Sequence, residues 1–174
     1  MKQLIRGVMT GVGLGAVMLT ASLAAQGIVK VEMKDAQGQS LGFATLSQSM
    51  GMVHIQLDLK GLKPGEHALH VHMTPKCEGP AFASAGGHFN PAAKKHGSQN
   101  PEGPHAGDMM NFTVDAKGNA KTTVTNKNVT MGAETNSLYA NGGTALMIHA
   151  AADDMKTDPS GNAGDRIICG AITK

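Results

Sequence analysis

Met52-Val53-His54-Ile55-Gln56-Leu57-Asp58-Leu59 is the stretch of the chain that decides its fold class. Apolar and polar side chains alternate along it, which is typical of a β-strand with one buried face and one face in water. His54 is then a solvent-facing strand residue. Turn-forming residues at 48–51 and 60–65 mark the two ends of this strand.

Seven more short stretches have the same β-rich character, and the sequence shows almost no helical periodicity. These stretches are residues 28–34, 41–47, 66–72, 111–114, 121–125, 144–150 and 166–172. Many short strands joined by turns predict an all-β protein, an eight-stranded antiparallel Greek-key barrel or sandwich. Two loops, 73–109 and 151–165, are too long and too rich in Gly, Pro, Asn and Asp to be simple connections, so we expect them to be functional.

The N-terminus predicts export. Lys2 and Arg6 precede an apolar run from 7 to 23, and small residues follow, so residues 1–25 are typical of a cleaved secretory signal. A membrane anchor is the alternative, but glycines interrupt the run and no basic stop follows it. We therefore expect a single domain at 26–174 without a stable membrane anchor, either periplasmic or secreted, in a bacterium.

Composition excludes some classes of partner. The chain has 15 Lys and Arg against 13 Asp and Glu, and two of the basic residues belong to the predicted signal, so the remainder is balanced. No basic footprint for nucleic acid remains. One Tyr and no Trp leave no aromatic platform for bases or sugars.

Two cysteines, Cys77 and Cys169, lie in the predicted exported part. An even number of cysteines in an exported chain indicates one disulfide. The alternatives are two free thiols or metal ligands, and the wide separation of the two residues argues against a cysteine-based metal site.

Six of the eight histidines fall into a pattern that predicts metal binding. His70 and His72 are two apart on a strand and therefore share one face, with Val71 directed into the core. His149 lies near the end of another apolar strand, which antiparallel pairing could bring alongside them. The first long loop adds the remaining candidates: His88, His96, His105 and Asp108. Imidazole suits copper and zinc, and three nitrogens with one oxygen suit a closed, structural zinc site.

At these positions the chain resembles the copper-zinc superoxide dismutase family. The matching motifs are Gly65-Glu66-His67-Ala68-Leu69-His70-Val71-His72, Gly87-His88-Phe89-Asn90-Pro91, Lys95-His96-Gly97, His105-Ala106-Gly107-Asp108, His149 through Asp153-Asp154, Gly161-Asn162-Ala163-Gly164-Asp165-Arg166 and Cys169-Gly170. They cover most of residues 27–172 in the family's order.

The resemblance implies one copper ion and one zinc ion per subunit. It implies copper ligands His70, His72, His88 and His149, and zinc ligands His88, His96, His105 and Asp108, with His88 shared. It further implies that Arg166 orients the substrate anion, that Asp153 links a copper ligand to a zinc ligand, and that Cys77 and Cys169 form a disulfide. A solvated loop carboxylate is the alternative for Asp153.

The resulting expectation is an enzyme that dismutates superoxide to dioxygen and hydrogen peroxide, with His88 delivering a proton. An exported copper- and zinc-binding module without useful turnover is the alternative. A zinc hydrolase is a third hypothesis, disfavoured because a closed zinc site has no open position. Family members include dimers and monomers, so the resemblance leaves a homodimer and a monomer as the two alternatives.

Four residues near the site keep two interpretations each. Lys156 is either a charge that guides the substrate or an ordinary exposed lysine. Met73, Met109 and Met110 flank ligand motifs and either capture cuprous ion or fill gaps in the core.

Overall fold

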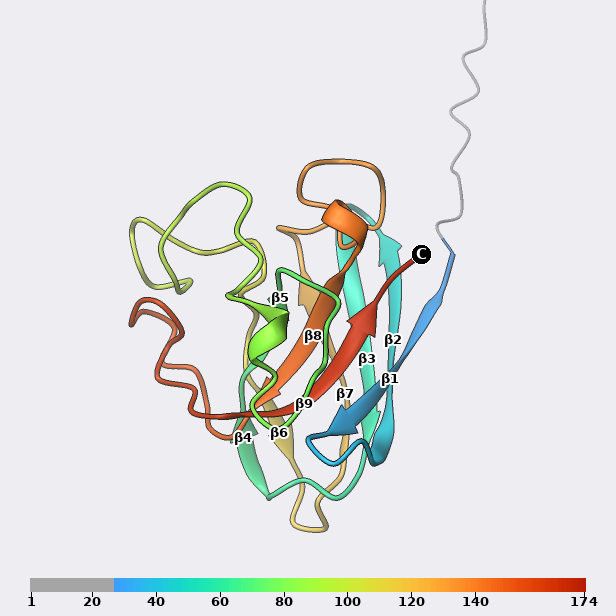
Figure 1. Cartoon of the computed structure of the whole chain (residues 1–174). Coiled ribbons are helices and arrows are strands. Elements are labelled where there is room, and N and C mark those ends of the chain that lie inside the picture. Colours follow the sequence, from blue (N-terminus) through green and yellow to red (C-terminus); the bar gives the residue numbers. More distant parts are fainter. Residues whose placement is uncertain (1–26) are drawn as a thin grey trace, which may run out of the picture.

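The computed structural model describes residues 27–174, so the predicted signal at 1–25 lies outside the described residues (Figure 1). Within this range the chain forms nine strands and two short 3₁₀ helices. They are β1 (Val29–Asp35), β2 (Ser40–Ser49), β3 (Met52–Leu59), β4 (Gly65–His67), β5 (Leu69–His72), η1 (Ala83–Ala85), β6 (Phe112–Val114), β7 (Ala120–Asn126), η2 (Ala140–Gly142), β8 (Thr144–His149) and β9 (Arg166–Ile172).

Seven strands form one curled antiparallel sheet in the order β5-β8-β9-β1-β2-β3-β7, and β4 pairs with β6 in a second, small sheet (Figure 1). Strands that are distant in the chain are neighbours here, since β9 lies beside β1 and β7 beside β3. This order is that of a Greek-key arrangement rather than of a meander. The predicted all-β fold class is confirmed.

The alternation that predicted β3 is confirmed by burial. Val53, Ile55 and Leu57 are completely buried, whereas Gln56 and Asp58 on the other face are exposed. The inward side chains of β3 join the main hydrophobic core, which fills the inside of the curled sheet. Burial of one face of each strand is the main stabilising contribution to such a sheet.

One expected strand, 66–72, is divided between the two sheets. β4 pairs with β6, whereas β5 pairs with β8, and Ala68 lies between them. The amide of Ala68 donates to Ala151 O (2.9 Å) and its carbonyl accepts from His149 N (3.1 Å). The chain thus changes its hydrogen-bonding partners at a completely buried small residue, which accounts for nine strands among residues 27–174 where eight were expected.

A second, smaller core surrounds a disulfide. Cys77 and Cys169 are bonded, with their Cα atoms 5.6 Å apart, so the predicted disulfide is confirmed and the alternative of free thiols is wrong. Phe82 and Met147 pack against this bridge and are almost completely buried. The disulfide therefore fastens the first part of the 73–109 loop to β9.

The two long loops lie side by side at one edge of the molecule, on the left of Figure 1. The amide of His96 donates to Asp158 Oδ1 (2.7 Å), and the amide of Gln99 donates to Met155 O (2.9 Å). Each loop thus supports the other. In the part of the chain that the structure describes, none of the helices has the length and apolar character needed to cross a membrane.

Candidate metal centre

Strand β5 presents His70 and His72 together. All four of its residues are buried, and Val71 belongs to the main hydrophobic core. On a strand, the residues on either side of Val71 point to the opposite face. Both imidazoles therefore point away from the main core, toward the long loops.

The free edge of β5 is covered by the 73–109 loop. The amide of Val71 donates to Gly107 O (2.9 Å), and its carbonyl accepts from Phe89 N (2.8 Å). Isolated β-bridges join His70 to Asp108 and His72 to His88. Only glycine fits at 107, because a Cβ there would lie 2.3 Å from Val71 O. These contacts place His88 and Asp108, two loop residues of the predicted metal sites, beside β5.

A register irregularity positions His149. β8 and β9 pair regularly until Ile148, where the register shifts and His149 comes to lie opposite Arg166. Bulges of this kind re-aim side chains beside functional sites. The ring of His149 is 4.8 Å from that of His70 and 5.6 Å from that of His72, measured between centroids.

Four histidines form the first cluster: His70, His72, His88 and His149, whose candidate ligand atoms all lie within 4.8 Å of one another. One nitrogen of each ring is engaged outside the cluster. The rings make these contacts through His70 Nε2 to Asp153 Oδ2 (2.8 Å), His72 Nδ1 to Gly86 O (2.9 Å), His88 Nδ1 to Asp108 Oδ1 (2.9 Å) and His149 Nδ1 to Gly164 O (3.1 Å).

The other nitrogen of each ring is the feature that points to a metal. Among the described residues, only His70 Nδ1, His72 Nε2, His88 Nε2 and His149 Nε2 are buried side-chain polar atoms without a hydrogen-bond partner. Leaving such an atom unsatisfied costs about 1–3 kcal/mol. All four belong to the same cluster, and imidazole nitrogens are ligands for copper and zinc. The cluster therefore fits a metal ion.

His88 is shared with a second cluster, which also contains His96, His105 and Asp108. Asp108 Oδ1 lies 2.9 Å from His88 Nδ1 and 3.1 Å from Nδ1 of both His96 and His105. Its other oxygen accepts from the amides of Gly97 and His105, both at 2.9 Å. Three nitrogens and one carboxylate oxygen, held in this way, fit a closed four-ligand site.

Burial and charge set the protonation of these groups. Burial lowers the pKa of His72 to about 2 and the pKa values of His88 and His149 to about 4. Burial raises the pKa of Asp108, but hydrogen bonds from the surrounding histidines outweigh it and hold that pKa well below its usual range. At neutral pH the first cluster thus offers neutral imidazoles and the second an ionised carboxylate, the forms that bind metals.

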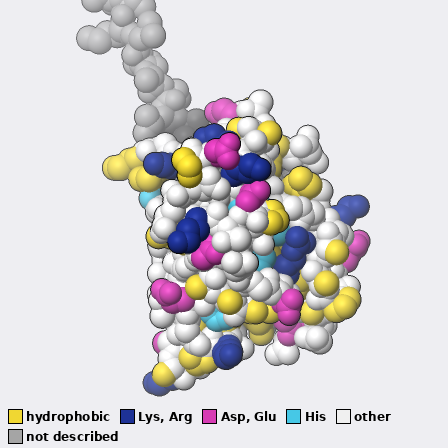
Figure 2. All heavy atoms as spheres, turned by 90° about the vertical axis from the view of Figure 1, so that its left-hand side faces the viewer, with side chains coloured by type: hydrophobic (Ala, Val, Ile, Leu, Met, Phe, Trp, Pro, Cys, Tyr) yellow, Lys and Arg dark blue, Asp and Glu magenta, His cyan; other side chains and the backbone are white. Residues whose placement is uncertain are grey.

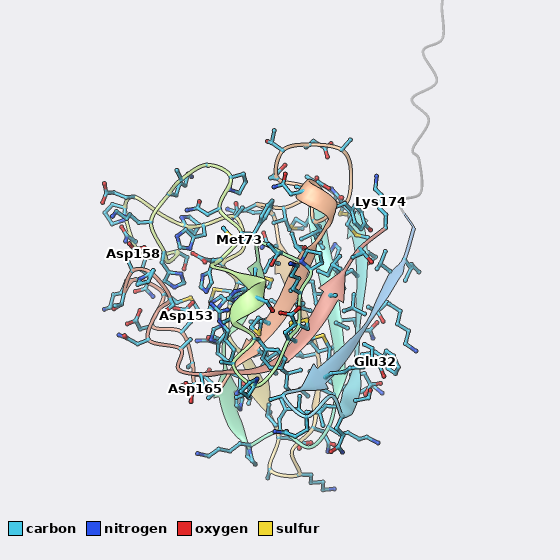
Figure 3. All side chains as sticks on the ribbon, in the orientation of Figure 1. Glu32, Met73, Asp153, Asp158, Asp165 and Lys174 are labelled. Carbon is cyan, nitrogen blue, oxygen red and sulfur yellow. A yellow bond between two sulfur atoms is a disulfide. The ribbon has the colours of Figure 1, made fainter. Side chains whose placement is uncertain are left out.

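Asp153 connects the two clusters. Its Oδ2 accepts from His70 Nε2 (2.8 Å) and its Oδ1 from His96 Nε2 (3.0 Å). Its side chain has no exposed surface. In Figure 3 it points from the 151–165 loop into the group of histidines. These hydrogen bonds fix the orientation of one ring in each cluster.

Arg166 lies beside the first cluster. Its Nη1 donates to Phe82 O at 2.8 Å, and Arg166 lies opposite His149 in the pairing of β8 with β9. Its charge contributes to lowering the pKa values of His72 and His149. Figure 2 shows the face formed by the two loops, where histidine side chains are only partly visible among the surrounding atoms. The site is thus a largely buried centre with Arg166 at its margin.

Two supporting residues were missed in the sequence. The side-chain amide of Asn111 binds both backbone groups of Asp153, donating to its carbonyl (3.0 Å) and accepting from its amide (2.9 Å). Asp158, at the outer end of its loop in Figure 3, accepts from the amide of His96. Their partners are 42 and 62 positions away in the chain, so no local pattern could have indicated either contact.

Burial separates the two interpretations for the three methionines but not for Lys156, which would be exposed under either one. Lys156 is exposed. Met109 is 5% exposed and belongs to the main core, whereas Met73 and Met110 are 45% and 61% exposed. Filling the core therefore describes Met109 but not the other two methionines.

Comparison with known proteins agrees with this geometry. The Copper/zinc superoxide dismutase (SODC) family model matches residues 40–172. The chain belongs to the copper/zinc superoxide dismutase family. "Superoxide dismutase [Cu-Zn] 2" of Aquifex aeolicus is 47% identical over 167 residues, which cover 94% of this chain and 98% of the relative. A second Aquifex aeolicus protein, "Superoxide dismutase [Cu-Zn] 1", is 47% identical over 159 residues, covering 90% of this chain and 94% of that protein.

Solved structures give the same result. A double mutant of a superoxide dismutase-like protein from Bacillus subtilis matches with a TM-score of 0.81 and 36% identity, over 83% of this chain and 97% of that one. The Cu/Zn superoxide dismutase from Brucella abortus matches with a TM-score of 0.69 and 28% identity, over 84% and 99%. Copper and zinc are the metals of this family, and the two clusters offer donor sets that fit them.

Proposed function

We propose that the protein dismutates superoxide, converting two superoxide anions and two protons into dioxygen and hydrogen peroxide. The observation that carries this proposal is the first cluster, in which four histidine nitrogens without partners face a common space beside Arg166. His88 joins this cluster to a closed second one. A metal-binding module would need neither a shared histidine nor a half-buried arginine at its margin.

We assign copper to His70, His72, His88 and His149, and zinc to His88, His96, His105 and Asp108. The all-nitrogen set suits copper, and the set with one carboxylate suits zinc. Copper bound in this place would supply reversible one-electron exchange with superoxide. The closed second cluster has no open position for a substrate, so the zinc hydrolase hypothesis has no support in this geometry.

His88 is suited to move a proton. Its Nδ1 faces the second cluster, and its Nε2 faces the first, where it has no hydrogen-bond partner. In our proposal Nε2 carries a proton to the peroxide that forms and takes up another for the next turnover. The contact of Nδ1 with Asp108 keeps the ring oriented during this exchange.

Arg166 is suited to bind the anion. Its guanidinium stays charged at every relevant pH, and one of its nitrogens is held by Phe82 O. Among the described residues this is its single side-chain hydrogen bond, so the other N–H groups can receive a small anion. Asp153, Gly86 and Gly164 meanwhile hold three of the rings, which keeps the geometry fixed on binding.

The test measures superoxide consumption by the mature, metal-analysed protein and by a copper-stripped sample. Arg166→Ala should retain both metals and lose turnover by about 10-fold or more at low ionic strength, the lower end of electrostatic steering effects. Arg166→Lys should lie between the two, since it keeps the charge but not the planar group. Lys121→Ala removes an exposed cation on β7 and serves as the control.

Full loading of both metals without turnover would overturn the enzyme proposal and favour a metal-binding module. Lost copper in Arg166→Ala would instead assign that residue a structural role. We further propose that the protein is exported, which the disulfide between Cys77 and Cys169 supports because such bridges persist in oxidising compartments.

A further inference from the structure

A cavity of about 480 Å³ lies where the 73–109 loop meets β3 and β7. Four of its eleven lining residues are methionines: Met52, Met109, Met110 and Met155. Residues 27–174 contain nine methionines, so nearly half of them line this one cavity. They come from three separate parts of the chain, so adjacency in the sequence does not explain the gathering.

Core filling accounts for only part of this group. Met109 and Met155 are 5% and 7% exposed, which suits packing. Met110, however, is 61% exposed, and Met52 is half-buried at the start of β3. A methionine that fills a gap in a core has no reason to be this open to solvent.

The backbone of Met155 adds a second observation. This residue has a φ of 65°, a left-handed conformation that costs a non-glycine residue about 1–3 kcal/mol. It is held there by its amide, which donates to Asp153 Oδ1 (2.6 Å), and by its carbonyl, which accepts from Gln99 N (2.9 Å). The 151–165 loop thus keeps Met155 at the cavity in a backbone conformation that this residue does not favour by itself.

We propose that the cavity binds a soft monovalent cation, Cu(I), through these methionine thioethers. Thioether sulfur is a ligand that selects Cu(I). Both cysteines are bonded to each other, so thioethers are the soft donors of the described chain. Lys127 also lines the cavity, but it is exposed, so its ammonium group can point away from the cavity into the solvent.

This site is distinct from the two histidine clusters, so the inference goes beyond the proposed function. The cavity reaches the second cluster through Asp108, which belongs to both. A cuprous ion held here would lie next to the metal centre without occupying either set of histidines.

The test adds Ag(I), a redox-inert stand-in for Cu(I), to the copper- and zinc-loaded protein carrying ¹³C-methyl methionine. One further equivalent should bind, the methyl signals of the four cavity methionines should shift, and bound copper and zinc should stay constant. Cu(I) affinity is then measured by competition with a chromogenic cuprous chelator. Met50, 95% exposed and outside the cavity, should give an unchanged signal.

Substitution by leucine separates sulfur from volume, because such swaps usually cost less than about 1.5 kcal/mol. Met52→Leu with Met110→Leu should lower Cu(I) and Ag(I) affinity by about 10-fold or more, since even an indirect contact to a metal is commonly worth that much. Met50→Leu is the matched control. Met110→Leu alone, at an exposed position, keeps the test available if the double variant is unstable.

The proposal is overturned if Ag(I) moves no cavity signal, if it binds only by displacing zinc or copper, or if the leucine variants keep the original affinity. Superoxide consumption should be unchanged in every leucine variant. A failure of this inference would therefore leave the proposed dismutase activity untouched, and the reverse also holds.

Discussion

Replacing Asp153 by asparagine should weaken metal binding in at least one of the two clusters while leaving the fold intact. The carboxylate accepts one ring N–H at each oxygen, from His70 (2.8 Å) and from His96 (3.0 Å). Asparagine has the same shape but only one oxygen. Its amide nitrogen would face a ring N–H, so one of the two histidines loses its acceptor and meets a second donor.

The size of the effect follows from the charge of the group that is replaced. A hydrogen bond to an ionised partner contributes about 1.5–3 kcal/mol. Since about 1.4 kcal/mol corresponds to a factor of ten, the affinity for the metal should fall by about 10- to 150-fold. This range agrees with the losses of about 10- to 100-fold seen when groups that orient metal ligands are changed.

The assay is competition with a chelator, with copper and zinc followed separately by elemental analysis. Asp165→Asn is the control, because it removes the same charge from an exposed position in the same loop. If Asp153→Asn retains both metals with the affinity of the unmodified protein, the reasoning is refuted. Equal losses in both variants would show that net charge rather than ring orientation matters.

Two more changes test the remaining parts of the site. Gly107→Ala should displace the loop from β5, because its Cβ would lie 2.3 Å from Val71 O. We expect the unfolding free energy to fall by about 1–3 kcal/mol and zinc to be retained more weakly, as measured by denaturation and elemental analysis. Unchanged values of both would contradict the close approach. In the metal-free protein, burial lowers the folded-state pKa values of His88 and His149 to about 4. Between about pH 6.5 and 4 the unfolded chain therefore binds more protons than the folded chain. The unfolding free energy should then fall as pH falls through this window. His96 acts in the opposite direction: burial lowers its pKa, but Asp108 and Asp153 raise it to about 9, so its contribution should be lost as pH rises toward 9. Chemical denaturation of chelator-treated protein from pH 4 to 9 measures both slopes, and a flat profile would contradict them.

The alternation of apolar and polar residues was sufficient to predict the strands in which buried and exposed residues alternate. Along β3, Val53, Ile55 and Leu57 face the core, so the pattern of apolar residues carries the structure directly. The division at Ala68 has no such pattern, because it depends on two different partner strands rather than on the residues of the segment itself. Local sequence indicates that a segment is extended, but not which neighbour it pairs with.

The same distinction applies to the site. Histidines two residues apart on a strand, together with further histidines in the 73–109 loop, predict metal binding from residue type and spacing. Asn111 and Asp158 are ordinary polar residues whose roles arise from contacts between the two long loops. The four methionines of the cavity likewise come from three chain segments that come together only in the folded protein. Contacts of this kind require the tertiary structure.

The hydrogen bonds between Val71 and the loop carrying His88 and Asp108 also bear on how the molecules behave in a crowded solution. β5 is an end strand of the seven-stranded sheet, and an uncovered end strand offers its backbone to the strands of other molecules. Here the loop that carries the candidate metal ligands His88, His96, His105 and Asp108 covers this edge. We therefore expect metal supply and resistance to self-association to be linked through this loop, because its release from β5 would expose a strand edge at which aggregation can begin.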